Sequence, residues 1–246
     1  MKQIPNILTL ANLFTGMIMI PYIIMGEVDI VLILLGIALI LDFLDGFLAR
    51  LLDASSELGK NLDSLADMVS FGVSSGLILA HLIAKSMGVA FPSNGFEQPL
   101  WMVGLLVPVF AAIRLAKYNI QQEEQHFSGV PTPANAMLVF SLWFLYEKGY
   151  AQGDSIWNSI SEGGWLPFFW LVLSLVSCVL MVLPVRLMAL KFKGFSWGEN
   201  RFRYVLIVLS GIVLIIFQSL ALPFIFLLYL GVSFVNNLQT SKEGSK

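Results

Sequence analysis

Charge, cysteine and histidine are scarce in this chain of 246 residues, and their scarcity excludes several classes of protein. Charged residues make up 12% of the sequence, about half the share that is usual in a soluble globular domain. The single cysteine, Cys178, cannot form an intrachain disulfide, and one cysteine with two histidines is too little for a zinc site. The formal net charge of −2 identifies no partner, and we expect no nucleic acid among the partners.

Apolar residues dominate instead, and they fall into segments long enough to cross a membrane. Hydrophobic residues account for 57% of the chain, and a hydrocarbon core requires about 20 residues of helix. The sequence therefore predicts an all-α polytopic transmembrane bundle, a single integral membrane domain over 1–246 with a core at 1–150 and additional helices at 164–236. About eight spans are expected, of which the last two could be one bent element: 8–25, 30–50, 61–84, 99–118, 134–150, 164–185, 203–219 and 221–236.

The basic residues predict an orientation for this bundle. If the loop at 51–60 faces the cytoplasm, twelve of the fourteen lysines and arginines lie on that side and only Lys85 and Lys148 lie on the other. This positive-inside pattern places both termini in the cytoplasm. No small-residue cleavage site follows Gly16, so we expect the first apolar segment to be retained as a helix.

Four aspartates lie at the cytoplasmic ends of the second and third expected spans. Asp42 and Asp45 are three residues apart and Asp63 and Asp67 four apart, so each pair shares a face of its helix, and antiparallel contact would bring the pairs together. Unpaired acids beside apolar runs are costly, and carboxylates suit hard divalent cations. We therefore expect these four residues to bind Mg²⁺ or Mn²⁺, two ions in all. In the alternative interpretation the acids are solvated helix ends with Arg50 as counter-ion.

The spacing Asp-x2-Asp-Gly-x2-Ala-Arg-x8-Gly-x3-Asp-x3-Asp over 42–67 resembles the signature of the CDP-alcohol phosphotransferase family at every position. The resemblance implies that Asp42 and Asp63 are shared by both metal ions, that Asp45 completes one site and Asp67 the other, and that Asp67 is the general base. It also implies a homodimer in a bacterial cytoplasmic (inner) membrane, with the active site facing the cytoplasm.

The same resemblance implies a set of residues that contact a CDP-lipid. Glycines one helical turn from Asp42 and Asp63 leave bare backbone that a nucleotide can approach closely. The expected contacts are Asn6, Thr9, Gly46, Arg50, Ser56 and Gly59. For Asn6 and Thr9 an equally weighted alternative is that they cap the first helix.

Stretches beginning at Pro5, Ser64, Ala112 and Phe127 further resemble the membrane-type phosphatidylserine synthases of this family. That branch implies transfer of a phosphatidyl group from CDP-diacylglycerol to L-serine, which yields phosphatidylserine and CMP. Arg114 and Lys117, three residues apart at the cytoplasmic end of the fourth span, are then expected to bind the carboxylate of serine.

Three alternatives remain open at this point. Arg114 and Lys117 could be ordinary membrane anchors that reach the headgroups. Glycerol 3-phosphate or an inositol compound could replace serine as the acceptor. A cation transporter could use the four acids as an ion path, although transport sites favour the middle of the membrane and these acids lie near its edge.

Overall fold

The computed structural model describes residues 3–91, 99–120, 129–151 and 164–183, with 204–206, 208–213, 223–226, 228–229 and 231–233. Every regular element within these residues is helical, which confirms the predicted all-α class. The helices are α1 (Ile4–Met25), α2 (Val28–Leu51), α3 (Glu57–Asp67), the π-helical η1 (Met68–Val73), α4 (Ser74–Ser86), the 3₁₀-helical η2 (Pro99–Leu105), α5 (Leu106–Ile120), α6 (Thr132–Ala151) and α8 (Leu166–Val182).

Four of these segments are long and apolar enough to cross a membrane, and the chain is therefore an integral membrane protein. They are Ile4–Met25, Val28–Leu51, Glu57–Ser86 and Pro99–Ile120. The first six expected spans coincide with helices to within a few residues, whereas the last two lie partly outside the described residues. The total of about eight spans stays a prediction.

Local sequence explains where the first helices begin and end. Pro5 occupies the first turn of α1, where its missing N–H costs no hydrogen bond. Gly26 ends α1 with φ of +77°, a conformation that glycine adopts without strain, and the chain turns directly into α2. Ser56 caps α3, since its Oγ accepts a hydrogen bond from the Gly59 N–H at 3.0 Å.

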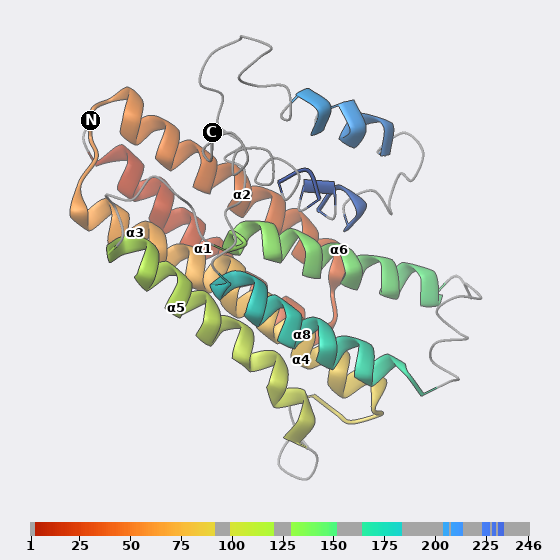
Figure 1. Ribbon diagram of the computed structural model, residues 1–246. Helices are drawn as coiled ribbons and strands as arrows, with labels where there is room; N and C mark the ends of the chain where they lie inside the picture. The colour runs from red at the N-terminus through yellow and green to blue at the C-terminus, as the bar shows by residue number, and fades with distance from the viewer. Residues whose placement is uncertain are drawn as a thin grey trace.

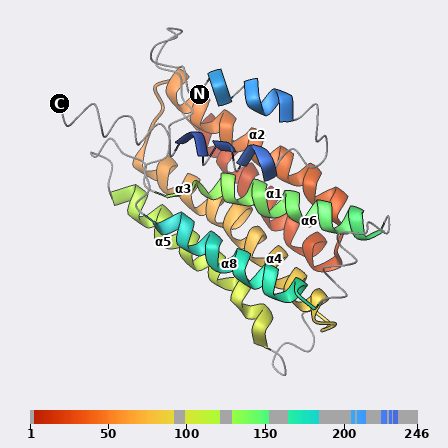
Figure 2. The ribbon, with the colours of Figure 1, turned by 45° about the vertical axis from the view of Figure 1, so that its right-hand side comes forward.

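The helices run side by side in one bundle, and α1 holds its amino-terminal part together (Figure 1; Figure 2). α1 packs against α2 on one side and against α3, η1 and α4 on the other. The interior contains large apolar side chains such as Phe71, Trp143 and Trp170. On α2, exposed apolar residues recur at helical spacing at Ile33, Ile37 and Ile40, which marks a face suited to lipid.

The end of the bundle away from the aspartates is tied by two ion pairs. Lys85 on α4 lies 2.7 Å from the carboxylate of Glu147 on α6, and Lys148 lies 2.7 Å from Asp29 on α2. Asp29 is about 20 Å along α2 from Asp42, given the rise of an α-helix. Lys85 and Lys148, which the charge pattern places on the opposite side from the other basic residues, therefore lie at the same end of the structure.

Small residues allow α4 and η2 to approach closely. A Cβ added to Gly104 would lie 2.5 Å from the Ala80 nitrogen and 2.9 Å from the Gly76 carbonyl oxygen. Both neighbours are backbone atoms, so they can yield only if the helices separate. Close backbone contact of this kind is a principal source of helix association within membranes.

We expect Gly104→Ala to destabilise the protein by about 1 to 3 kcal/mol, because the added methyl group overpacks this contact. Gly36→Ala on α2 is the matched control, since its Cβ would have no heavy atom within 4 Å. The measurement is thermal unfolding of both variants in detergent. An unchanged midpoint for Gly104→Ala would show that the contact is looser than the structure indicates.

Candidate active site

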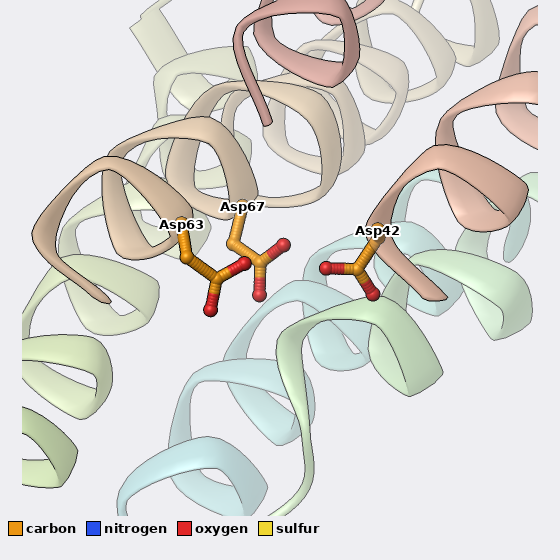
Figure 3. A group of neighbouring side chains, drawn as sticks. All are labelled: Asp42, Asp63 and Asp67. Carbon is orange, nitrogen blue, oxygen red and sulfur yellow. The ribbon is translucent and has the colours of Figure 1, made fainter. Parts of the chain in front are cut away.

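Three carboxylates converge from two helices at one point inside the bundle. Asp63 and Asp67 project from the same face of α3, and Asp42 projects toward them from α2 (Figure 3). One carboxylate oxygen of each lies within 4.8 Å of the others. The four-residue spacing of Asp63 and Asp67 produces this arrangement, because it places the two side chains one turn apart.

The helices that carry the three clustered acids both pack on α1. Among the described helices α2 and α3 have few direct contacts with each other, and both pack instead on α1. Direct antiparallel packing of the two acid-bearing helices, which would bring the pairs together, is therefore not the arrangement observed. Asp42 still reaches Asp63 and Asp67 while both helices pack on α1.

A π-helical segment begins directly after Asp67. The wider turn of η1 carries Ser70, whose hydroxyl donates to the Asn12 carbonyl oxygen of α1 at 2.9 Å. Gly16 on α1 lies directly against the Ser70 backbone, so a side chain there would displace η1. Together these contacts fix the position of Asp67 along the axis of α1. π-helical turns occur frequently at functional sites.

Asp45, the fourth predicted metal ligand, lies apart from the other three. It is 4% exposed, and its Oδ2 lies 2.5 Å from the Thr9 hydroxyl, which is also 3.0 Å from the Pro5 carbonyl oxygen. One oxygen of Asp45 thus has a protein partner. Gln3, rather than Asn6 or Thr9, occupies the N-cap position of α1, and it forms no side-chain cap. The capping alternative for Asn6 and Thr9 is therefore wrong.

A cavity of about 580 Å³ adjoins the acids, within the range of small-molecule sites. Its lining includes all six residues predicted to contact a CDP-lipid, Asn6, Thr9, Gly46, Arg50, Ser56 and Gly59, as well as Asp45 and Asp63. A Cβ on Gly59 would lie 2.9 Å from Asn6 Oδ1, whereas one on Gly46 would meet only the tip of Arg50 at 3.7 Å. Bare backbone therefore faces the cavity at Gly46, and Asn6 partly covers it at Gly59.

Arg50 is exposed and is not the counter-ion of the acids. Among the described residues ion pairs form at the far end of the bundle, and Arg50 forms none. The alternative interpretation of solvated helix ends neutralised by Arg50 lacks the ion pair that it requires.

Arg114 and Lys117 differ in environment despite their spacing. Arg114 is 8% exposed, and its Nη1 donates to the Thr132 hydroxyl at 2.9 Å. No ion pair joins it to Asp67 in the described part of the chain. Lys117 is exposed and does not line the cavity. The buried position of Arg114 differs from that of an ordinary headgroup anchor.

One polar wall of the cavity consists of residues that were not predicted from the sequence. Lys60 Nζ donates to the Asn119 carbonyl oxygen at 2.8 Å and lies 5.8 Å from the centre of the Tyr118 ring. The Asn119 amide nitrogen lies 2.9 Å from Ser64 Oγ, which ties α3 to the end of α5. A signal was available, because Lys60 precedes Asp63 by three residues and shares its face.

The three clustered carboxylates fit a divalent cation. Oxygen ligands are the ones that Mg²⁺ and Mn²⁺ prefer, and a cation would offset the mutual repulsion of the acids. Asp67 is 9% exposed, and its Oδ1 has no hydrogen-bond partner among the described residues. A buried carboxylate oxygen without a partner is costly, and a metal ion would satisfy it. Asp42, Asp63 and Asp67 are the residues that could hold such an ion.

The site is thus an acidic, metal-compatible centre beside a small-molecule cavity in a helical membrane protein. The family model for CDP-alcohol phosphatidyltransferase matches residues 2–176 and so includes all of these residues. The chain belongs to this family.

Three relatives carry informative names. Proteins from Mycobacterium tuberculosis and Helicobacter pylori, each named CDP-diacylglycerol–serine O-phosphatidyltransferase, are 33% identical over 178 residues and 35% identical over 210 residues. The matches cover 69% and 84% of this chain, and 56% and 79% of the respective relatives. An archaetidylserine synthase from Methanothermobacter thermautotrophicus is 30% identical over 144 residues, 57% of each chain. This chain thus matches only about half the length of the mycobacterial relative.

We expect Asp63→Asn to weaken Mn²⁺ binding by more than roughly tenfold, because it removes a ligand charge from the cluster. Asp29→Asn is the matched control, since Asp29 pairs with Lys148 at the other end of the bundle. Titration of the purified protein with Mn²⁺, followed by electron paramagnetic resonance, measures the effect without turnover. Equal affinities in the two variants would exclude Asp63 from the metal site.

Proposed function

We propose that this protein transfers the phosphatidyl group of CDP-diacylglycerol to L-serine and releases phosphatidylserine and CMP. The observation that carries the proposal is the convergence of Asp42, Asp63 and Asp67 beside the cavity, within the segment that the family model matches. The names of the bacterial relatives support serine as the acceptor. Family membership favours this enzyme over the alternative of a cation transporter.

The proposed donor site is the cavity itself. Arg50 and Lys60 contribute positive charge to its lining, and Asn6, Ser56 and Asn119 contribute hydrogen-bonding groups. A nucleotide pyrophosphate needs both kinds of partner. The lipid tails of the donor would extend from this cavity along the apolar outer faces of the helices into the bilayer. In the proposed orientation the cavity opens toward the cytoplasm, and the enzyme is a homodimer in the bacterial inner membrane.

In the proposed reaction Asp67 accepts the proton of the serine hydroxyl. The serine oxygen forms a bond to the phosphorus that carries diacylglycerol, and the bond from that phosphorus to the oxygen of CMP breaks. Asp42, Asp63 and Asp67, with Asp45 as the further ligand, would hold two ions of Mg²⁺ or Mn²⁺, which when bound neutralise negative charge on the pyrophosphate. Arg114 would bind the serine carboxylate, with Lys117 at the approach to the site.

The acceptor panel tests this function. Purified protein with CDP-diacylglycerol and Mg²⁺ or Mn²⁺ should release CMP when L-serine is added, and far less with glycerol 3-phosphate or inositol, because the bacterial relatives are named for serine as the acceptor. Release of CMP is measured by chromatography. A preference for glycerol 3-phosphate would assign the protein another acceptor, and metal flux into proteoliposomes without CMP release would support the transporter.

Asp67→Asn should abolish serine-dependent CMP release while largely preserving binding of CDP-diacylglycerol, because Asp42 and Asp63 still offer two carboxylates to a metal ion. Asp42→Asn should impair both binding and turnover, since Asp42 is the carboxylate that α2 contributes to the cluster. Binding is measured by competition with a fluorescent CDP-lipid. Near wild-type turnover in Asp67→Asn would contradict its role as the base.

A further inference from the structure

Arg114 lies among buried polar side chains that do not line the cavity. Its side chain is 8% exposed, and its Nε has no hydrogen-bond partner among the described residues. On α6, Thr132 is fully buried and Asn135 is 2% exposed, and the Asn135 amide nitrogen also lacks a partner in the described part of the chain. Two buried donors without partners are costly to retain unless a ligand satisfies them.

Thr132 is held so that its hydroxyl faces the arginine. Its Oγ1 accepts a hydrogen bond from Arg114 Nη1 at 2.9 Å. Its methyl group packs toward Gly72 of η1, because a Cβ added to that glycine would lie 3.9 Å from Thr132 Cγ2. A β-branched side chain with both branches engaged has little freedom at χ1. The orientation of Thr132 therefore fixes the orientation of the guanidinium.

Arg114 and Asp67 are both buried, and no ion pair joins them in the described part of the chain. Both side chains are therefore available to a small ligand with two functional groups. L-serine has a hydroxyl and a carboxylate separated by two carbon atoms, so it could place one group at Asp67 and the other at Arg114. Inositol has no anionic group, and glycerol 3-phosphate has a phosphate in place of the carboxylate.

We infer that Thr132 is a positioning residue for acceptor specificity. By fixing the Arg114 guanidinium it directs Nε toward the carboxylate of the acceptor, while the acceptor hydroxyl lies at Asp67. Asn135, one turn along α6 from Thr132 and on the same face, would supply a second donor. The inference rests on the proposed function and assigns the recognition of a carboxylate to Thr132, Arg114 and Asn135, without Lys117.

The test separates the hydroxyl of Thr132 from its shape. Thr132→Val keeps the two branches and removes the hydroxyl, and it should raise the apparent KM for L-serine roughly tenfold while the KM for CDP-diacylglycerol stays within about twofold. Thr132→Ser keeps the hydroxyl and should restore most of the affinity for serine. Thr15→Val is the control, because it removes a buried hydroxyl that bonds only within α1, to the Ala11 carbonyl oxygen at 2.8 Å.

A second arm uses the wild-type protein alone and does not depend on the folding of a variant. L-serinamide has the serine hydroxyl but a neutral amide in place of the carboxylate, and its kcat/KM should be roughly ten- to hundredfold below that of L-serine. Equal use of serinamide and serine would overturn the inference. So would an unchanged serine KM in Thr132→Val, or a parallel rise in the KM values of both substrates.

The outcomes separate the inference from the function beneath it. Wild-type protein that releases no CMP with L-serine would overturn the proposed function and the inference together. Wild-type protein that uses serine, with Thr132→Val indistinguishable from it, would overturn the inference alone.

Discussion

The structure depends on bringing like charges together inside an apolar bundle. Carboxylate oxygens of Asp42, Asp63 and Asp67 lie within 4.8 Å of one another, and Asp67 is 9% exposed. Repulsion between carboxylates is strong where water is scarce, so the helices must resist separation until a cation binds. The packing around the acids therefore has to be rigid on both the α2 side and the α3 side.

Close packing of small residues supplies that rigidity. Gly16 brings α1 against η1 at Ser70, one turn beyond Asp67, and Gly104 brings η2 against Ala80 on α4. Helices surrounded by lipid gain little from the hydrophobic effect, since lipid tails are as apolar as leucine, so such contacts provide much of the attraction. The Ser70 hydroxyl bonded to the Asn12 carbonyl oxygen adds a polar tie at the same level. The segment that carries Asp63 and Asp67 is thus fixed along its length.

The sequence predicts what depends on local spacing and leaves open what depends on contacts between distant residues. Apolar runs predict the helices, and the pairs Asp42/Asp45 and Asp63/Asp67 predict the acidic centre. The hydrogen bond between Asp45 and Thr9 joins residues 36 positions apart, and that between Lys60 and Asn119 joins residues 59 apart. Neither contact has a local signature, although spacing does place Lys60 on the face of Asp63. Spacing also misleads for Arg114 and Lys117. Side chains three residues apart on a helix point in directions that differ by about 60°, which is enough to bury one and expose the other.

The cations differ in burial in a way that suits two substrates of different size. Arg50 is exposed and Lys60 half-buried, both at the open cavity, while Arg114 is buried outside the cavity lining and hydrogen-bonded to Thr132. Exposed charge attracts a large anion but discriminates weakly, because water competes for each contact. A buried donor discriminates strongly, since an analogue without the matching group leaves that donor unsatisfied. Under the proposed function, the more exposed cations bind the nucleotide that the whole family shares. The buried cation binds the acceptor, which distinguishes one branch from another. Chemistry shared by the family and the choice of acceptor then depend on different residues, so the acceptor site can change while the acidic centre stays the same.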